Sequence, residues 1–239
     1  MNLQYTAFVI ATLFLASLLG YAAYRSAQLL QHWRPPRNPM LMGAENAMRL
    51  FLVIACILLG WASGLDRQTL GWTWDSAARQ ALYGLGWGLG LALIFGIATR
   101  RLIAHTGRRY YSPLVMELIL PKSTAEFGAL ALAMIPAVLL EELLYRSLLI
   151  GGLSPHVSPA LLIVGVGLLF GLLHTPQGTW GVLGAGLAGM LFGVLFVWEG
   201  SLLLPVVAHY VANMAQIAWV YARPGSATSP TSAPDHAEA

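Results

Sequence analysis

The chain has 239 residues, of which 57% are hydrophobic and only 10% are charged, whereas a soluble domain typically has about 25% charged residues. This composition, with a mean hydropathy of +0.67, excludes an ordinary soluble domain and predicts an all-α, polytopic membrane helix bundle. The formal charge of +3 does not indicate a nucleic-acid partner, because the basic residues lie in loops beside apolar segments and form no basic patch interleaved with aromatic residues.

Apolar stretches predict about seven transmembrane helices. The N-terminal stretch lacks a basic n-region and is longer than a signal-peptide core, so we expect it to remain as a span. A shorter stretch, 113–120, is interrupted by Glu117 and predicts an interfacial helix because it is too short to cross the bilayer. In chain order the predicted spans are 5–24, 47–63, 81–99, 127–153, 159–174, 180–198 and 202–221.

The distribution of basic residues predicts the orientation. The second connection holds only Arg67 and Arg79, offset by Asp66 and Asp75. The positive-inside bias therefore places the N-terminus outside and the C-terminus in the cytoplasm, and we expect the membrane to be a bacterial inner membrane. The first and third connections are the basic ones, with Arg25, Arg34, Arg37, Arg100, Arg101, Arg108, Arg109 and Lys122.

Three regions are expected: an N-terminal transmembrane region (1–126), a core with the polar motifs (127–222) and a tail (223–239). The tail is rich in Pro, Ser, Thr and Ala and is predicted to be disordered.

The only cysteine, Cys56, lies in an apolar span, which indicates a buried hydrophobe and excludes an internal disulfide. Small residues spaced by four predict close helix packing: Gly86 and Gly90, Gly167 and Gly171, and Gly181, Ala185, Gly189 and Gly193.

The span 127–153 carries two adjacent carboxylates, Glu141 and Glu142, with Arg146 one turn later. Ionised groups at membrane depth are costly, so a functional role is the default interpretation. Glu142 and Arg146 are spaced i, i+4 on a helix and can pair, which would leave Glu141 free for chemistry. Tyr145 lies one turn after Glu141 and is a possible hydrogen-bond partner. A buried ion pair that only fixes helix packing would account for Glu142 but not for Glu141.

Two later spans carry further polar residues. Phe170 and His174 share a helix face, and Pro176 ends that helix directly after the histidine. His209 and Asn213 are also one turn apart on one face, downstream of Pro205. Interhelical hydrogen bonding alone is the alternative interpretation of His209 and Asn213, and a shared functional role is favoured.

Together these side chains predict hydrolysis of an amide bond. Glu141 with His174 can hold and deprotonate a water, while His209 with Asn213 can donate hydrogen bonds to an oxyanion. No serine or threonine is linked to them by spacing, so water is the expected nucleophile.

The motifs EELLYR (141–146), FGLLH (170–174) and HYVAN (209–213), in this order on successive spans, resemble the CPBP family of intramembrane proteases. That family includes CaaX prenyl endopeptidases and bacteriocin-processing proteins. The resemblance covers 127–221 and implies a membrane endopeptidase acting on a protein or peptide substrate. It also implies that Glu141 and His174 activate water, that His209 and Asn213 form the oxyanion site, and that Glu142 and Arg146 support the structure.

Three questions remain open from the sequence. Glu141, His174 and His209 could ligate zinc, but no HExxH spacing is present and a metal-free mechanism is favoured. A transporter or proton relay could use the same Glu and His residues, as could a non-catalytic scaffold. Finally, Glu141 lies near mid-span and His174 near a helix end, so their nominal depths differ by about 10 Å at a rise of about 1.5 Å per residue.

Overall fold

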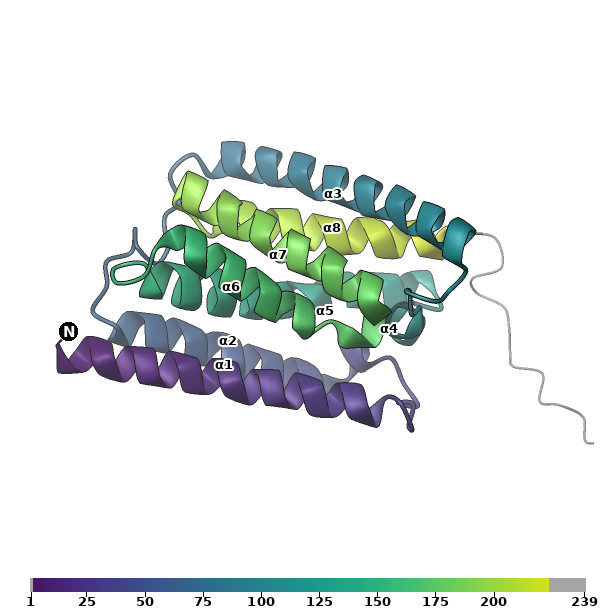
Figure 1. The fold of residues 1–239 in the computed structure, drawn as a ribbon, viewed down its shortest axis with the longest axis horizontal. Helices are drawn as coiled ribbons and strands as arrows, with labels where there is room; N and C mark the ends of the chain where they lie inside the picture. Colours follow the sequence, from purple (N-terminus) through teal and green to yellow (C-terminus); the bar gives the residue numbers. More distant parts are fainter. Residues whose placement is uncertain (1, 224–239) are drawn as a thin grey trace, which may run out of the picture.

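A computed structural model describes residues 2–223, and in that part of the chain it contains helices and no strand. α5 continues directly into a π-helix, η2. Apart from Arg223, the predicted disordered tail lies outside the described residues. The elements are α1 (Leu3–Leu29), η1 (Pro39–Leu41), α2 (Gly43–Ala62), α3 (Ala77–Thr106), α4 (Leu114–Ile119), α5 (Thr124–Glu142), η2 (Leu143–Gly151), α6 (Pro159–Leu172), η3 (Thr175–Gln177), α7 (Gly178–Glu199) and α8 (Leu203–Tyr221) (Figure 1).

The predicted membrane helix bundle is confirmed. Within residues 2–223, six helical stretches are long and apolar enough to cross a membrane: α1, α2, α3, α5 with η2, η3 with α7, and α8. The remaining predicted span, 159–174, forms α6, which has only 14 residues and is about 21 Å long at 1.5 Å per residue. That is shorter than the roughly 30 Å hydrocarbon core of a bilayer. α4 forms where the short interfacial helix was predicted.

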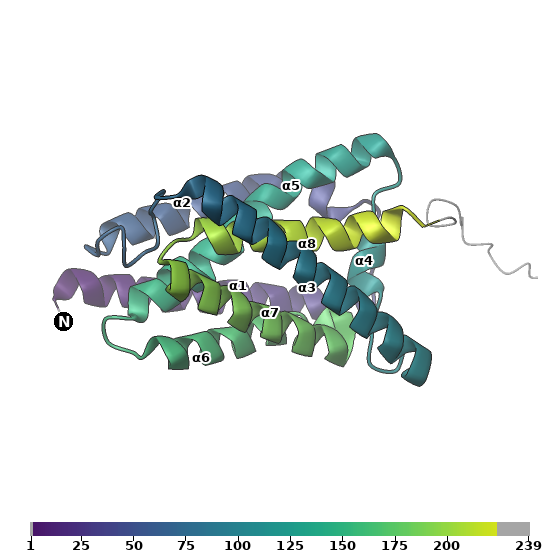
Figure 2. The same cartoon turned by 90° about the horizontal axis from the view of Figure 1, so that it is seen from above.

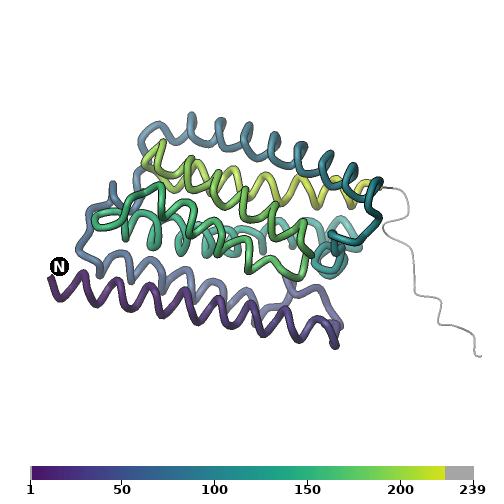
Figure 3. The backbone as a smooth tube through the Cα atoms, viewed as in Figure 1, coloured from purple at the N-terminus to yellow at the C-terminus, as the bar shows by residue number. Residues whose placement is uncertain are grey.

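The axes of the long helices lie roughly along the long axis of the molecule (Figure 3). α1 and α2 lie on one side, α3 on the opposite side, and α5, α6, α7 and α8 between them (Figure 1). Seen from above, α3 crosses α7 and α8 obliquely (Figure 2). The helices that carry the polar motifs are therefore the inner ones.

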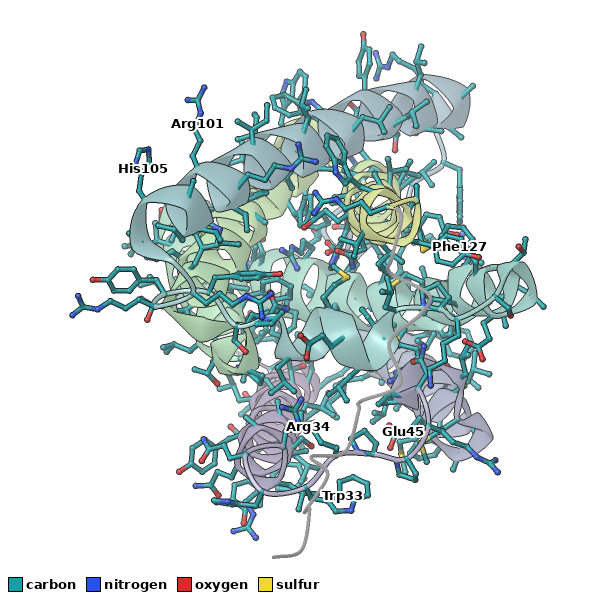
Figure 4. The ribbon with its side chains drawn as sticks, turned by 90° about the vertical axis from the view of Figure 1, so that its right-hand side faces the viewer. Trp33, Arg34, Glu45, Arg101, His105 and Phe127 are labelled. Atoms are coloured by element: carbon teal, nitrogen blue, oxygen red, sulfur yellow. The ribbon has the colours of Figure 1, made fainter. Side chains whose placement is uncertain are left out.

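Basic residues from different connections lie at one end of the bundle. Figure 4 looks onto that end and shows Arg34 from the connection after α1 together with Arg101 and His105 near the end of α3. This grouping is the one that the positive-inside bias predicts for the cytoplasmic end. The orientation itself stays a prediction.

Two side chains cap the N-terminus of α5, which lies at the same end of the bundle. The Ser123 hydroxyl accepts a hydrogen bond from the Glu126 N–H at 3.2 Å, and the Glu126 carboxylate accepts one from the Lys122 N–H at 2.7 Å. This arrangement is a variant of the capping box, which satisfies N–H groups that have no partner inside the helix. It begins the helix that ends at Glu142.

Glycine allows two pairs of helices to approach closely. Gly167 and Gly171 of α6 face Gly186 of α7, as the four-residue spacing predicts. On α3 the predicted pair is wrong: a Cβ at Gly86 or Gly90 would meet nothing within 4 Å. The pair that contacts α8 is instead Gly84 and Gly88. Two faces of this glycine-rich helix have the same spacing, and α8 covers only one of them.

These two faces give a matched test of packing. A Cβ at Gly88 would lie 2.6 Å from the Ala208 carbonyl oxygen, so Gly88→Ala forces α3 away from α8 and should cost about 1–3 kcal/mol of stability. Gly86→Ala meets open space and should be neutral or stabilising, because alanine favours helix. Unfolding of both variants in detergent micelles measures the difference. Equal destabilisation would contradict the close contact of α3 with α8 at Gly88.

Candidate active site

Glu142, the last residue of α5, lies at the centre of a buried polar network. Its Oε2 is 3.2 Å from Nε of Arg146 in the ion pair predicted from their spacing. Its Oε1 accepts a hydrogen bond from Nδ1 of His209 at 2.7 Å. Arg146 also donates from Nη2 to the Gly189 carbonyl at 3.1 Å. Glu142 and Arg146 are fully buried, so this carboxylate is held by partners and is closed to solvent.

Aromatic rings surround the guanidinium of Arg146. The Phe170 and Phe192 ring centroids lie 5.0 and 5.4 Å from its Cζ, and that of Tyr145 lies at 6.0 Å. Rings at such distances attract a cation through their quadrupoles. The rings also exclude water from the Glu142–Arg146 ion pair, which strengthens the attraction between its charges.

His209 of α8 connects the two carboxylates. Its ring stacks on Phe192, with 4.9 Å between centroids and 24° between planes. Because a carboxylate only accepts hydrogen bonds, Nδ1 must carry the proton in the contact with Glu142. Its other nitrogen, Nε2, lies 3.6 Å from Oε2 of Glu141. The Glu142 contact thus orients the imidazole so that Nε2 faces Glu141.

Glu141 differs from Glu142 in its surroundings. The Glu141 side chain is 38% exposed, whereas that of Glu142 is fully buried. Glu141 lines a cavity of about 230 Å³ together with Tyr145, Phe170 and His174. The rest of the wall is apolar. Leu19 and Ala23 of α1 form part of it, together with Leu140, Leu144 and Leu173.

His174 lies two residues beyond the end of α6. Its Nδ1 donates to the Phe170 carbonyl at 2.7 Å, since a carbonyl oxygen accepts hydrogen bonds. In the neutral ring Nε2 is then the basic nitrogen. Despite the depth difference expected from the sequence, His174 lines the same cavity as Glu141.

The segment after His174 is fixed by the connection between α3 and α4. Ser112 N–H donates to the Gln177 carbonyl at 3.0 Å, and Trp180 N–H donates to the Tyr110 carbonyl at 2.8 Å. Gly178 between them has φ of +79°, and a Cβ there would lie 2.8 Å from the Tyr110 carbonyl oxygen. Only glycine fits this conformation and this contact without strain.

Some predicted site residues lie apart from the cavity. Asn213 follows His209 by one turn on α8, but its amide Nδ2 faces the Met134 sulfur at 3.8 Å. Neither Asn213 nor His209 is among the residues that line the cavity. Tyr145 contacts Phe170 edge-on at 5.3 Å, and among the described residues no hydrogen bond joins it to Glu141. The π-helix begins at Leu143, which changes the one-turn spacing assumed for Glu141 and Tyr145.

The sequence reasoning missed several contributors to the site. Phe192 and the Gly189 carbonyl contact His209 and Arg146, and Leu19 and Ala23 form a wall of the cavity. All of them are apolar side chains or backbone groups in apolar spans. The i, i+4 spacing of Leu19 and Ala23 was the only available signal, and it is common in any helix.

The zinc alternative concerns Glu141, His174 and His209. Among residues 2–223, no three His, Cys, Asp or Glu side chains are arranged to hold a metal ion. Nδ1 of His209 and Nδ1 of His174 are both engaged in hydrogen bonds, and Glu142 is committed to Arg146 and His209. The metal-free mechanism stays a prediction.

Comparison with known proteins gives one family. Residues 123–215 match the family model described as type II CAAX prenyl endopeptidase Rce1-like. No curated protein and no solved structure gives a significant match to the chain. The matched region is less than half of the 239 residues, but it contains all three polar motifs, so the resemblance to CPBP proteases is confirmed there. The chain is a membrane helical protein whose residues 123–215 match the Rce1-like endopeptidase family, and this match implies a protease.

Proposed function

We propose that the chain is an intramembrane endopeptidase that hydrolyses a peptide bond in a membrane-associated or C-terminally anchored protein. In this proposal Glu141 and His174 activate the attacking water, and His209 and Asn213 stabilise the oxyanion. The observation that carries it is the difference between the two adjacent carboxylates. Glu142 is buried between Arg146 and His209, while Glu141 is partly exposed in a cavity shared with His174.

The cavity supports water as the nucleophile. Its lining residues include no serine, threonine or cysteine, so no side chain of the usual acyl-enzyme type faces the space. A water there can lose a proton to the Glu141 carboxylate as its oxygen attacks the carbonyl carbon. The proton then passes to the leaving nitrogen as the C–N bond breaks, with the His174 Nε2 as a second proton acceptor and donor.

The contacts of His209 support a role in binding the oxyanion. Nδ1 already donates to Glu142, so Nε2 can donate only if the ring is doubly protonated. Such a ring would balance the local charge, because Glu141 and Glu142 would then face Arg146 and a cationic His209. An imidazolium beside the developing oxyanion stabilises it electrostatically.

Asn213 would be the second donor in this proposal. Its amide currently faces only the sulfur of Met134, at 3.8 Å, and a thioether is a weak acceptor. Turning toward a substrate oxygen therefore costs little. One turn of α8 separates Asn213 from His209, so both project from the same face of one helix.

The apolar cavity wall supports a membrane-associated substrate. α1 contributes Leu19 and Ala23 to this wall, and the only buried residues of α1 lie in its first half: Tyr5, Phe8 and Thr12. The second half of α1 therefore separates the cavity from the surrounding lipid with few internal contacts. A substrate with an apolar anchor fits this environment, and the bilayer and a protein or peptide substrate are the expected partners.

The test compares two histidines. Purified protein in proteoliposomes is incubated with membrane-anchored peptides, and mass spectrometry identifies new C-termini, which acquire ¹⁸O when the water is labelled. His174→Ala should slow product formation by about 100-fold, as expected for loss of a proton-transfer group. His156→Ala, at an exposed residue near Tyr5, should cleave like the wild type. Flux of ions without any cleavage product would instead favour the transporter alternative.

A further inference from the structure

The helix that carries Glu141 and Glu142 changes from α to π immediately after them. The π-helix η2 spans nine residues, all of them buried. π-helices are rare and usually form single-turn bulges, often at functional sites. Nine residues in this conformation need support from outside the helix.

We propose that the connection between α2 and α3 clamps η2 and thereby positions Arg146, and through it Glu142 and His209. For this purpose the clamp is defined as residues 66–73. The proposal rests on the proposed function only for its kinetic consequence. Its structural part, that the clamp holds the Glu142–His209 contact, can be tested without any activity.

Ser147 is the central contact between the clamp and η2. It is fully buried and lies next to Arg146. Its hydroxyl donates to the Leu70 carbonyl at 2.8 Å and accepts from the indole Nε1–H of Trp72 at 2.9 Å. Both the proton and a lone pair of the hydroxyl are thus used by the clamp. Loss of either hydrogen bond leaves a buried polar group unpaired, which is costly.

Two glycines allow the clamp to reach the helix. A Cβ at Gly151, the last residue of η2, would lie 2.4 Å from the Thr69 carbonyl oxygen. A Cβ at Gly60 of α2 would lie 2.6 Å from the Trp72 ring. The backbone of the clamp therefore rests against the end of η2, while Trp72 fills the space between α2 and η2.

The clamp has its own internal support. The Asp66 carboxylate accepts hydrogen bonds from the Thr69 N–H at 2.7 Å and from the Thr69 hydroxyl at 3.1 Å. These bonds lower the pKa of Asp66. They close a turn just before Leu70, the residue whose carbonyl meets Ser147.

The clamp is also bonded to the connection that leads into α8. Leu202 N–H donates to the Gly71 carbonyl at 2.8 Å, and the Thr73 hydroxyl donates to the Gly200 carbonyl at 3.2 Å. An ion pair joins Arg79, near the start of α3, to Glu199, the last residue of α7. One structure therefore contacts both η2, which carries Arg146, and the start of the helix that carries His209.

The register of η2 links these contacts to the site. Each i→i+5 ring contains one residue more than an α-helical ring, so return of the segment to α geometry would rotate Ser147 and Arg146 relative to Glu142. Ser147 would then lose its contacts with Leu70 and Trp72. The clamp contacts at Ser147 thus depend on the π conformation of η2, in which the neighbouring Arg146 lies 3.2 Å from Glu142.

The test uses three variants of the full chain. Ser147→Ala removes the hydroxyl, and Trp72→Phe removes only the indole N–H and part of the ring. Thr106→Val is the matched control, because it removes a hydroxyl that donates to the Leu102 carbonyl at the end of α3, outside the clamp, η2 and the site. The first readout is the NMR signal of the His209 Nδ1–H in ¹⁵N-histidine-labelled protein, assigned by its loss in His209→Gln. The second is kcat and KM for cleavage.

The proposal predicts that Ser147→Ala and Trp72→Phe shift or broaden the His209 signal and lower kcat about tenfold to 100-fold with KM unchanged, since small misplacements of reacting groups have effects of this size. Thr106→Val should change neither. An unchanged His209 signal in both variants overturns the proposal, as does a moved signal with unchanged kcat. If the wild type cleaves nothing, the proposed function fails and the His209 signal alone decides whether the clamp exists.

Discussion

Arg146→Ala is expected to lower the free energy of unfolding by about 3–5 kcal/mol, which is typical when one partner of a buried ion pair is removed. Arg146 and Glu142 are both fully buried, with Nε and Oε2 3.2 Å apart. Without the guanidinium, the Glu142 carboxylate would keep only its contact with His209. Denaturant-induced unfolding in mixed micelles measures the loss.

An exposed ion pair supplies the control for Arg146. Arg79 pairs with Glu199 but is 54% exposed, and pairs of this kind contribute about 0–1 kcal/mol. Arg79→Ala should therefore change stability little. A loss of less than about 1 kcal/mol in Arg146→Ala would show that Glu142 is not held as a buried carboxylate.

The double variant Arg146→Met, Glu142→Leu separates stability from activity. Replacing both members of a buried ion pair by apolar residues of similar size is often neutral or stabilising, so most of the stability should return. Cleavage should not return, because Nδ1 of His209 loses its acceptor and the ring is no longer oriented toward Glu141. Recovery of both properties would contradict the role assigned to the Glu142–His209 contact.

Local features of the site could be predicted from the sequence. The Glu142–Arg146 ion pair follows from i, i+4 spacing in one helix, and the contact of Phe170 with His174 follows from the same rule. The spans follow from hydropathy, since a long apolar stretch with few charges is typical of a membrane-crossing helix. These inferences need only the geometry of a single element.

Features that depend on contacts between helices could not be predicted. Glu142 and His209 are 67 residues apart, and no spacing rule indicates that this histidine binds the supporting carboxylate. The α-to-π change at Leu143 is stabilised by a connection far away in the sequence. Gly84 with Gly88 and Gly86 with Gly90 have the same four-residue spacing. Only the position of α8 determines that Gly84 and Gly88 form the contact.

The proposed function depends on a difference in task between the two adjacent glutamates. Glu142 holds Arg146 and His209 in place, whereas Glu141 has room and solvent access to take a proton. Glu141→Gln keeps the size of the side chain and removes the base. Because Glu141 is partly exposed and its contact with His209 is long, at 3.6 Å, this variant should fold like the wild type.

The decisive measurement is the single-turnover rate of peptide cleavage in proteoliposomes by Glu141→Gln, with Glu117→Gln at an exposed glutamate of α4 as the matched control. Loss of a general base should lower the rate of Glu141→Gln by about 10³–10⁴-fold, with unchanged unfolding, while Glu117→Gln cleaves at the wild-type rate. Cleavage by Glu141→Gln at the wild-type rate would contradict the role of Glu141 as the base.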